Sequence, residues 1–313
     1  MNGEKIMGLE IFKFIIYSFM IVIIAKYILV RVLRKLAESL QLSARTVGNI
    51  AGLATSIPEL LTVSFSAFTG LLGTSIYNIL SSNVINLIQY LFSIVLAKNQ
   101  KVLKNKALRV DLFLVILTIL IPIAILLVGW DFSFRIVPIF LLSFVLFYLL
   151  NKNAHKLYLP KQEGILEEEI KAEEKNLTSK TRILITHSIY LLATGVLLYF
   201  IGNKLSIVLE NLADMFFVSE WIIGIALGFI TSIPELITFF EAQKHHKKKE
   251  ENEIGVIEAT NNLLLSNMLN LFVIQSIGIL IYTWSQTPIP NQEEILVVQR
   301  QKNMVKMIKK KFI

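Results

Sequence analysis

The sequence predicts an all-α, polytopic membrane protein, and three observations favour this fold class. Of the 313 residues, 54% are hydrophobic and only 17% are charged, which is too apolar for an ordinary water-soluble domain. Eight apolar stretches approach or exceed the length of about 20 residues that a helix needs to cross a bilayer. Basic residues gather in alternate connections between these stretches, as the positive-inside rule requires.

The eight predicted transmembrane helices cover residues 9–33, 47–69, 72–97, 108–129, 134–151, 181–206, 217–240 and 254–284. The first stretch has an acidic flank and no small-residue cleavage site, so we expect a retained helix and not a signal peptide. The sequence holds no cysteine, which excludes disulfide bonds and thiolate metal ligands.

The basic connections define a topology. They follow the first, third, fifth and seventh stretches and comprise Arg31 to Arg45, Lys98 to Arg109, the charged segment 152–182, and Lys244 to Lys249. The positive-inside rule places them in the cytoplasm and the amino terminus outside. The three tryptophans, Trp130, Trp221 and Trp284, then fall at outer helix ends, where interface anchors are expected. Because topology explains the net charge of +8, we expect no nucleic-acid partner.

One hexapeptide occurs twice inside predicted transmembrane helices. Both Thr55–Leu60 and Thr231–Leu236 read TSIPEL. A carboxylate at the centre of a membrane helix costs roughly 2.5–3.5 kcal/mol on insertion scales, so Glu59 and Glu235 indicate a functional site. The predicted topology gives the two copies opposite orientations, which is typical of inverted-repeat transporters with midplane substrate sites.

Each hexapeptide combines several oxygen atoms near one break in a helix. Pro58 and Pro234 have no N–H, so they free the carbonyl oxygens four residues earlier. A freed carbonyl at this depth is tolerated only where it faces protein or a water-filled cavity. Thr55 lies four residues before Glu59, so its hydroxyl and the carboxylate are expected on one helix face.

The helix after each hexapeptide carries a polar residue at every fourth position. The two stripes align at a constant offset and consist of Thr74, Asn78, Ser82 and Asn86, and of Glu258, Asn262, Ser266 and Asn270. Together with the hexapeptides they supply oxygen ligands without Cys or an aligned His. Hard cations such as calcium prefer this set, whereas zinc and copper favour nitrogen or sulfur. Asn78 and Asn262 are equally well explained as ligands or as hydrogen-bonding groups between helices.

The motifs T-S-x-P-E-L and S-N-x-x-N, repeated in inverted halves, resemble the alpha repeats of the sodium/calcium exchanger branch of the calcium/cation antiporters. The resemblance covers residues 9–284 and implies a transporter without catalytic residues or a cofactor. It implies one half-site of Thr55, Ser56, Glu59, Ser82 and Asn86, and another of Thr231, Ser232, Glu235, Ser266 and Asn270. The two glutamates would be shared calcium ligands, with sodium at surrounding hydroxyl and carbonyl positions.

The sequence departs from this family at a few positions. Ala54 and Ile230 replace the usual glycine before Thr-Ser, and Ser81 and Leu265 replace the one before Ser-Asn. Members that need potassium carry Asp where Asn270 stands, so no potassium dependence is expected. The family has ten helices, whereas this sequence becomes polar and basic after Trp284.

We therefore predict a first repeat of five helices at 1–151 with its motif at 47–90, and a cytoplasmic linker at 152–182. A second repeat of three helices follows at 183–284 with its motif at 221–275, and a basic tail at 285–313 replaces the last two helices.

The predicted function is exchange of calcium for sodium across the plasma membrane by alternating access, with the two ions and the lipid bilayer as partners. A calcium/proton antiporter and a truncated, non-transporting cation-binding paralogue are the alternatives. An intramembrane hydrolase is disfavoured because no Ser and His pair can be placed as nucleophile and base. The sequence indicates no oligomeric state.

Overall fold

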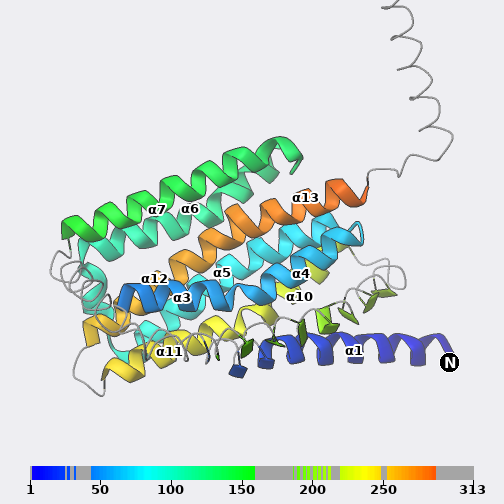
Figure 1. Cartoon of the computed structure of the whole chain (residues 1–313), viewed down its shortest axis with the longest axis horizontal. Coiled ribbons are helices and arrows are strands. Elements are labelled where there is room, and N and C mark those ends of the chain that lie inside the picture. Colours follow the sequence, from blue (N-terminus) through cyan, green and yellow to red (C-terminus); the bar gives the residue numbers. More distant parts are fainter. Residues whose placement is uncertain are drawn as a thin grey trace, which may run out of the picture.

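A computed structural model describes residues 2–24, 44–158, 219–247 and 252–286, with isolated positions at 27–32 and 186–212. The described part consists of helices and turns, and the long helices run side by side along one axis (Figure 1). The chain is thus an all-α protein, as its composition and apolar stretches predict.

Seven helical segments in the described part are long and apolar enough to cross a membrane. They are Met7–Ile24, Gly48–Phe68, Leu72–Ala97, Lys106–Val128, Phe134–Tyr158, Glu220–Lys244 and Glu253–Ser285. These segments confirm seven of the eight predicted spans and a multi-pass membrane protein. The remaining span, 181–206, is described only at isolated positions, and residues 287–313 of the basic tail lie outside the described residues.

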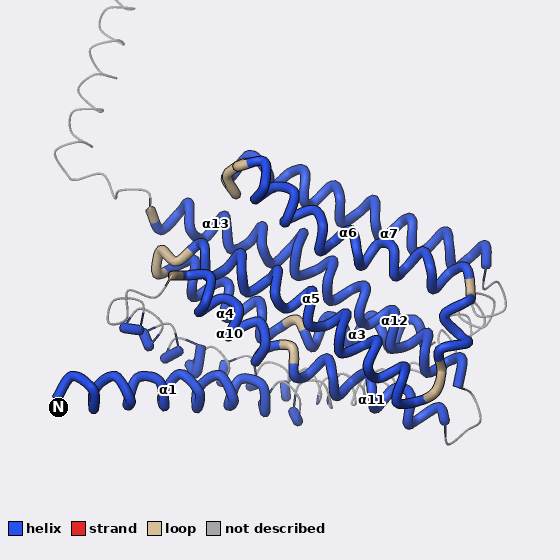
Figure 2. Tube along the Cα trace, turned by 180° about the vertical axis from the view of Figure 1, so that it is seen from behind, coloured by secondary structure: helices blue, strands red, loops and turns tan. Residues whose placement is uncertain are grey.

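Two of these spans are broken near their middle. The first consists of α3 (Ala44–Thr55) and α4 (Ile57–Phe68), the second of α10 (Glu220–Thr231) and α11 (Ile233–Lys247). The breaks fall at Ser56 and Ser232, whose torsions are nearly identical (φ −80°, ψ −2° and φ −79°, ψ −4°). The broken spans run in opposite directions (Figure 1), and both interruptions lie near the middle of the bundle (Figure 2).

The proline in each hexapeptide explains the position of the break. Ser56 N–H still donates to the Gly52 carbonyl at 3.2 Å, and Leu60 N–H donates to Ser56 at 3.0 Å. Between them, Pro58 has no N–H to offer the Ala54 carbonyl. The helix is interrupted for one residue and then restarts in nearly the same direction.

Each repeat packs the first half of its broken helix against the polar helix of the other repeat. Helix α10 lies along α5 (Leu72–Ala97), and α3 lies along α12 (Asn252–Met268). Glycines allow this approach, because a Cβ at Gly228 would lie only 2.7 Å from the Asn78 carbonyl oxygen. A Cβ at Gly52 would lie 2.8 Å from the Asn262 carbonyl oxygen. The two polar stripes are thereby held against the two breaks.

The second polar helix continues through a π-helical segment, η4 (Leu269–Ile274), into α13 (Gln275–Ser285). Phe272 of η4 packs edge-on against Phe140 and Phe147 of α7 (Val137–Tyr158), with ring centroids 5.9 Å and 5.0 Å apart. Helices α6 (Lys106–Val128) and α7 thus cover one side of the bundle (Figure 1).

Helix α7 continues past residue 151, where the linker was predicted to begin, and ends at Tyr158. A buried polar cluster explains the extra length. Asn151 Nδ2 donates to Asp111 Oδ1 of α6 at 2.8 Å, and His155 Nε2 lies 2.7 Å from Asp111 Oδ2. These contacts hold α7 against α6 up to Tyr158, seven residues into the segment 152–182 that is predicted as a linker.

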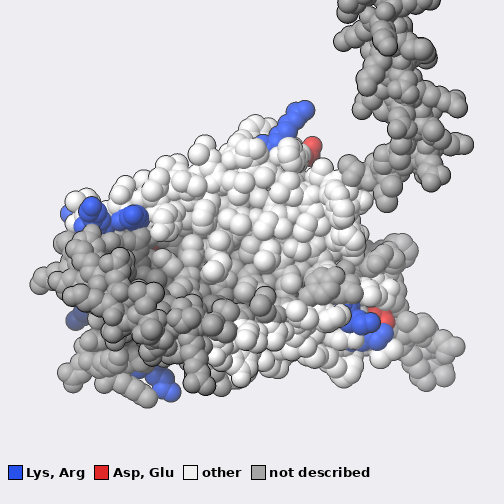
Figure 3. Space-filling view, viewed as in Figure 1, with Lys and Arg blue, Asp and Glu red and all other residues white. Residues whose placement is uncertain are grey.

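The remaining described elements lie at the edges of the bundle. Helix α1 (Asn2–Ile24) packs against α10, and two short 3-10 helices, η2 (Gln100–Lys104) and η3 (Phe134–Ile136), lead into α6 and α7. In the view of Figure 3, Lys and Arg appear at the ends of the bundle, and the described surface visible between them is uncharged. Large apolar side chains such as Phe92, Leu142 and Trp284 are more than half exposed there, which suits contact with lipid.

The glycine crossings give a first prediction. Gly228→Ala should destabilise the protein by about 1–3 kcal/mol, because the added methyl group overlaps the α5 backbone. Thermal unfolding of the purified protein in detergent measures the effect. Gly8→Ala is the matched control, since nothing lies within 4 Å of its Cβ position. Equal melting temperatures for the two variants would contradict the proposed backbone contact.

Candidate cation site

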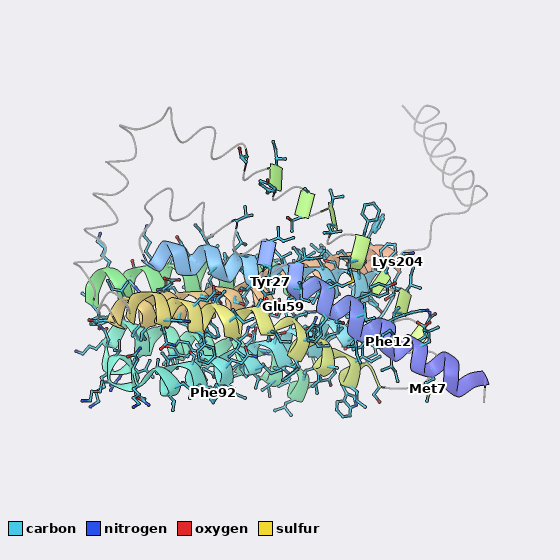
Figure 4. All side chains as sticks on the ribbon, turned by 90° about the horizontal axis from the view of Figure 1, so that it is seen from below. Met7, Phe12, Tyr27, Glu59, Phe92 and Lys204 are labelled. Atoms are coloured by element: carbon cyan, nitrogen blue, oxygen red, sulfur yellow. The ribbon has the colours of Figure 1, made fainter. Side chains whose placement is uncertain are left out.

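All ten predicted site residues lie inside the bundle. Glu59 is found about midway along its length (Figure 4). Exposed fractions are 2% or less for the whole set: Thr55, Ser56, Glu59, Ser82, Asn86, Thr231, Ser232, Glu235, Ser266 and Asn270. They come from the two breaks and from the two polar helices that pack against them.

The two carboxylates occupy equivalent positions. Glu59 is in the first turn of α4, and Glu235 is in the first turn of α11, where the helix dipole favours negative charge. The carboxyl groups are close enough for the charge of Glu235 to act on Glu59. The inverted repeats therefore bring both acids into one region of the protein interior.

Hydroxyl groups surround the carboxylates in a two-fold arrangement. Ser266 Oγ donates to Glu235 Oε1 at 3.1 Å, and the Thr55 hydroxyl also faces this carboxyl group. The Ser82 and Thr231 hydroxyls lie near Glu59 without a hydrogen bond to its carboxylate, and their oxygens lie 3.3 Å apart.

Each glutamate thus lies near the hydroxyl of a serine from its own repeat and of a threonine from the other repeat. Thr55 Oγ1 also lies 3.4 Å from Asn262 Oδ1, so this hydroxyl contacts the opposite repeat. The link between repeats is direct, since Ser56 Oγ donates to Ser266 Oγ at 3.0 Å. The two predicted half-sites are interleaved.

Four asparagines form a second two-fold link. Asn83 Nδ2 donates to the Asn267 carbonyl at 3.2 Å, and Asn267 Nδ2 donates to the Asn83 carbonyl at 3.1 Å. The side-chain oxygens of this pair accept hydrogen bonds from Asn270 Nδ2 and Asn86 Nδ2, each at 3.2 Å. The amide nitrogens of Asn86 and Asn270 are thereby occupied, each by a residue of the other repeat.

Five buried oxygen atoms at this place have no hydrogen-bond partner among the described residues. They are both carboxylate oxygens of Glu59, Oε2 of Glu235, and the side-chain oxygens of Asn86 and Asn270. A buried polar group without a partner is costly, and a buried carboxylate more so. A hard cation would satisfy all five, because calcium and sodium bind carboxylate and amide oxygens.

Asn78 and Asn262 are used differently. Asn78 Nδ2 donates to Thr62 Oγ1 at 2.7 Å, and Asn262 Nδ2 donates to Thr238 Oγ1 at 2.6 Å. Their oxygens lie 3.5 Å from Ser82 Oγ and 3.4 Å from Thr55 Oγ1 respectively. Both ends of each amide are engaged, which favours the interhelical role over the ligand role.

The sequence reasoning missed Asn83 and Asn267 as site residues. Each is the first asparagine of the S-N-x-x-N motif but lies one position away from the four-residue stripe. A signal was present, because the two asparagines align at the same offset as the stripes. The glycine pairs Gly48 and Gly224, and Gly52 and Gly228, likewise align at the offset of the hexapeptides.

Comparison with protein families gives one match. The model described as "Sodium/calcium exchanger protein" matches residues 11–152 and 186–305, which include both broken helices and both polar stripes. No curated protein matches the chain.

The chain is also similar to solved structures of the sodium-calcium exchanger NCX_Mj. One, from crystals soaked with Na+ and zero Ca2+, has 21% sequence identity and a TM-score of 0.49, covering 88% of this chain and 83% of that chain. Another, soaked with Na+ and Sr2+, has 20% identity and a TM-score of 0.45 with the same coverage.

The asparagine link gives a second prediction. Asn83→Ala should weaken calcium binding about ten-fold, because Asn270 in the other repeat loses the acceptor that orients its amide. Calcium titration of the purified protein by calorimetry measures this. Asn99→Ala is the control, since this buried asparagine bonds to Gln243 and does not contact the site.

A double-mutant cycle tests the link itself. In an Asn270→Ala background, Asn83→Ala should reduce calcium affinity much less than it does in the wild-type protein, because the effects of coupled residues are not additive. If the losses of calcium affinity in the two single variants add fully in the double variant, Asn83 does not act through Asn270.

Proposed function

The chain belongs to the sodium/calcium exchanger protein family, and on this basis we propose that it exchanges calcium for sodium at the Glu59–Glu235 site. Members of this family are cation transporters and not enzymes. The observation that carries the proposal is the set of five unpaired, buried oxygens at the meeting point of two inverted, broken helices.

The charge of the site explains why two different ions would exclude each other. Glu59 and Glu235 supply two negative charges, which one calcium ion or two sodium ions neutralise. Both ions accept the same oxygen ligands, so they compete for one region. Because the empty site leaves two carboxylates buried without a counterion, binding of one ion species is favoured as the other leaves. This competition couples the two fluxes.

The ligand set suits calcium. Calcium takes six to eight oxygens in flexible geometry, and the site offers carboxylate, amide and hydroxyl oxygens from both repeats. A third sodium ion, as the family resemblance implies, would move one net charge per cycle. The membrane potential would then contribute about 2.3 kcal/mol per charge per 100 mV.

The repeat architecture supports alternating access. Ion sites at the midplane of inverted repeats open to one side or the other when the repeats move against each other. In this chain the units that stay together are α10 with α5 and α3 with α12, because their backbones are in contact at the glycines. The breaks at Ser56 and Ser232 lie between these units and the rest of the broken spans.

We place the protein in the plasma membrane with its amino terminus outside. The basic connections support this orientation through the positive-inside rule. The exposed side chains of Trp130, Trp221 and Trp284 support it as well, because they suit the outer interface. The end of the bundle that holds Trp284 is then extracellular.

The third prediction tests the carboxylates. In proteoliposomes loaded with sodium, dilution into sodium-free buffer should drive calcium uptake. Glu59→Gln and Glu235→Gln should each reduce this uptake to background, because one negative charge no longer balances a divalent cation. Glu10→Gln is the matched control, since Glu10 is a buried carboxylate of a membrane span that pairs with Lys13 at 2.6 Å.

The same assay separates the rival functions. Unchanged uptake in both glutamine variants would contradict the proposed site. Uptake that follows a pH gradient in sodium-free buffer would assign proton exchange instead. Calcium binding without uptake in the wild-type protein would indicate a cation-binding protein that does not transport.

A further inference from the structure

Two serines occupy equivalent positions beside the two carboxylates, but only one of them is hydrogen-bonded to its glutamate. Ser266 Oγ donates to Glu235 Oε1 at 3.1 Å. Ser82 is the equivalent residue of the first repeat, and it makes no hydrogen bond to Glu59. Among the described residues, Glu235 thus has one unpaired carboxylate oxygen and Glu59 has two.

The serine at the first helix break explains where the Ser266 proton goes. Ser56 Oγ lies 2.8 Å from the Gly52 carbonyl oxygen and 3.0 Å from Ser266 Oγ, and it can donate to either. It therefore approaches Ser266 from one side as a donor and already has a contact with the nearest backbone acceptor. The Ser266 proton is directed to the other side, where Glu235 accepts it.

The second break is arranged differently. Ser232, the equivalent of Ser56, points to the Ser82 carbonyl oxygen at 3.5 Å and not to the Ser82 hydroxyl. Ser82 Oγ in turn lies 3.4 Å from the Gly228 carbonyl oxygen and 3.5 Å from Asn78 Oδ1. The Ser82 proton thus has acceptors on the backbone and on an amide, and the carboxylate of Glu59 stays without a donor.

The Ser266 hydrogen bond places a proton on an oxygen that a cation can use. Calcium binds carboxylates through one or both oxygens. Hydrogen bonds to an ionised carboxylate are about twice as strong as those between neutral groups. Ser266 and Glu235 are both fully buried, so bulk water does not weaken their bond. A calcium ion that takes Glu235 Oε1 must displace this proton, whereas Glu59 offers both oxygens without such a step.

We propose that Ser266 is a positioning residue that lowers the calcium affinity of the site, because its hydroxyl competes with the ion for Glu235 Oε1. The inference rests on the proposed function and adds an internal competitor to it. A transported ion must be held weakly enough to leave, and this competition favours its release. Sodium is affected less, since a singly charged ion gains half as much as calcium from each carboxylate oxygen. Ser266 thus shifts the preference of the site towards sodium.

Two matched variants distinguish a competitor from a simple ligand. Ser266→Ala removes the donor and frees Glu235 Oε1, whereas Ser82→Ala removes the equivalent hydroxyl and frees no carboxylate oxygen. If both serines act only as ligands, both variants bind calcium more weakly. If Ser266 competes with calcium, only its variant binds calcium more tightly.

The experiment is a calorimetric titration of the purified, full-length protein with calcium, in sodium-free buffer at alkaline pH. Ser266→Ala should raise the calcium affinity about ten-fold, which corresponds to the loss of one hydrogen bond to a charged group. Ser82→Ala should give no increase. Ser266→Thr keeps the hydroxyl and should bind calcium with nearly the wild-type affinity. The sodium concentration that displaces half of the bound calcium should also rise in Ser266→Ala.

Transport kinetics separate this role from a structural one. In proteoliposomes, Ser266→Ala should lower both the half-saturating calcium concentration and the maximal rate of calcium exchange, because an ion that is held more tightly leaves more slowly. A variant that merely loosens the packing of α12 would lower the rate and raise the half-saturating concentration.

The result is separable from the proposed function. An unchanged or reduced calcium affinity in Ser266→Ala overturns the inference and leaves the exchanger intact. An equal increase in Ser266→Ala and Ser82→Ala also overturns it, because the gain would not depend on the bond to Glu235. A wild-type protein that binds calcium without transporting it overturns the exchange function, while the titration still decides the competition. A wild-type protein that binds no calcium overturns both.

Discussion

The structure depends on keeping two carboxylates in the interior of a membrane protein, where no basic side chain among the described residues forms an ion pair with them. Removing Glu59 and Glu235 from water is unfavourable, and their mutual repulsion increases the cost. The protein supplies hydroxyls from four residues and the dipoles of two helix starts, but these do not cancel two full charges. A cation bound at the site, as proposed, would supply the missing counter-charge.

The repeat packing follows from this constraint. Neither repeat alone can surround its own carboxylate, because the break turns Thr55 and Thr231 towards the opposite glutamate. The glycines bring the backbones of the two repeats into contact. The reciprocal hydrogen bonds between Asn83 and Asn267 hold this pair in place, and its side-chain oxygens orient the amides of Asn86 and Asn270. A cation bound to one repeat therefore contacts side chains whose orientation the other repeat sets, which makes its affinity sensitive to any relative movement.

The sequence predicted the helices and the breaks within them. It did not predict features that depend on contacts between helices. The apolar stretches, the proline breaks and the burial of all ten site residues follow from local composition and duplicated motifs. The interleaving of the threonines could not be predicted, because it depends on how the helix restarts after Ser56 and Ser232. The Asp111 cluster joins residues about 40 positions apart, and the π-helical turn lies where Phe272 packs against Phe140 and Phe147 of another helix.

Departures from two-fold symmetry carry a physical consequence. If the repeats were identical, the state open to one face and the state open to the other would have equal energies, since each repeat would simply adopt the conformation of its partner. The Tyr90–Phe239 pair is an edge-on aromatic contact between α5 and α11, whereas the corresponding positions in the other repeat are the smaller Ile274 and Val63. Edge-on pairs contribute about 0.5–1.5 kcal/mol beyond their buried area, and a movement that separates α5 from α11 must overcome this contribution. If the protein works by alternating access, as proposed, this asymmetry favours the state open towards the Trp284 end when no membrane potential or ion gradient acts.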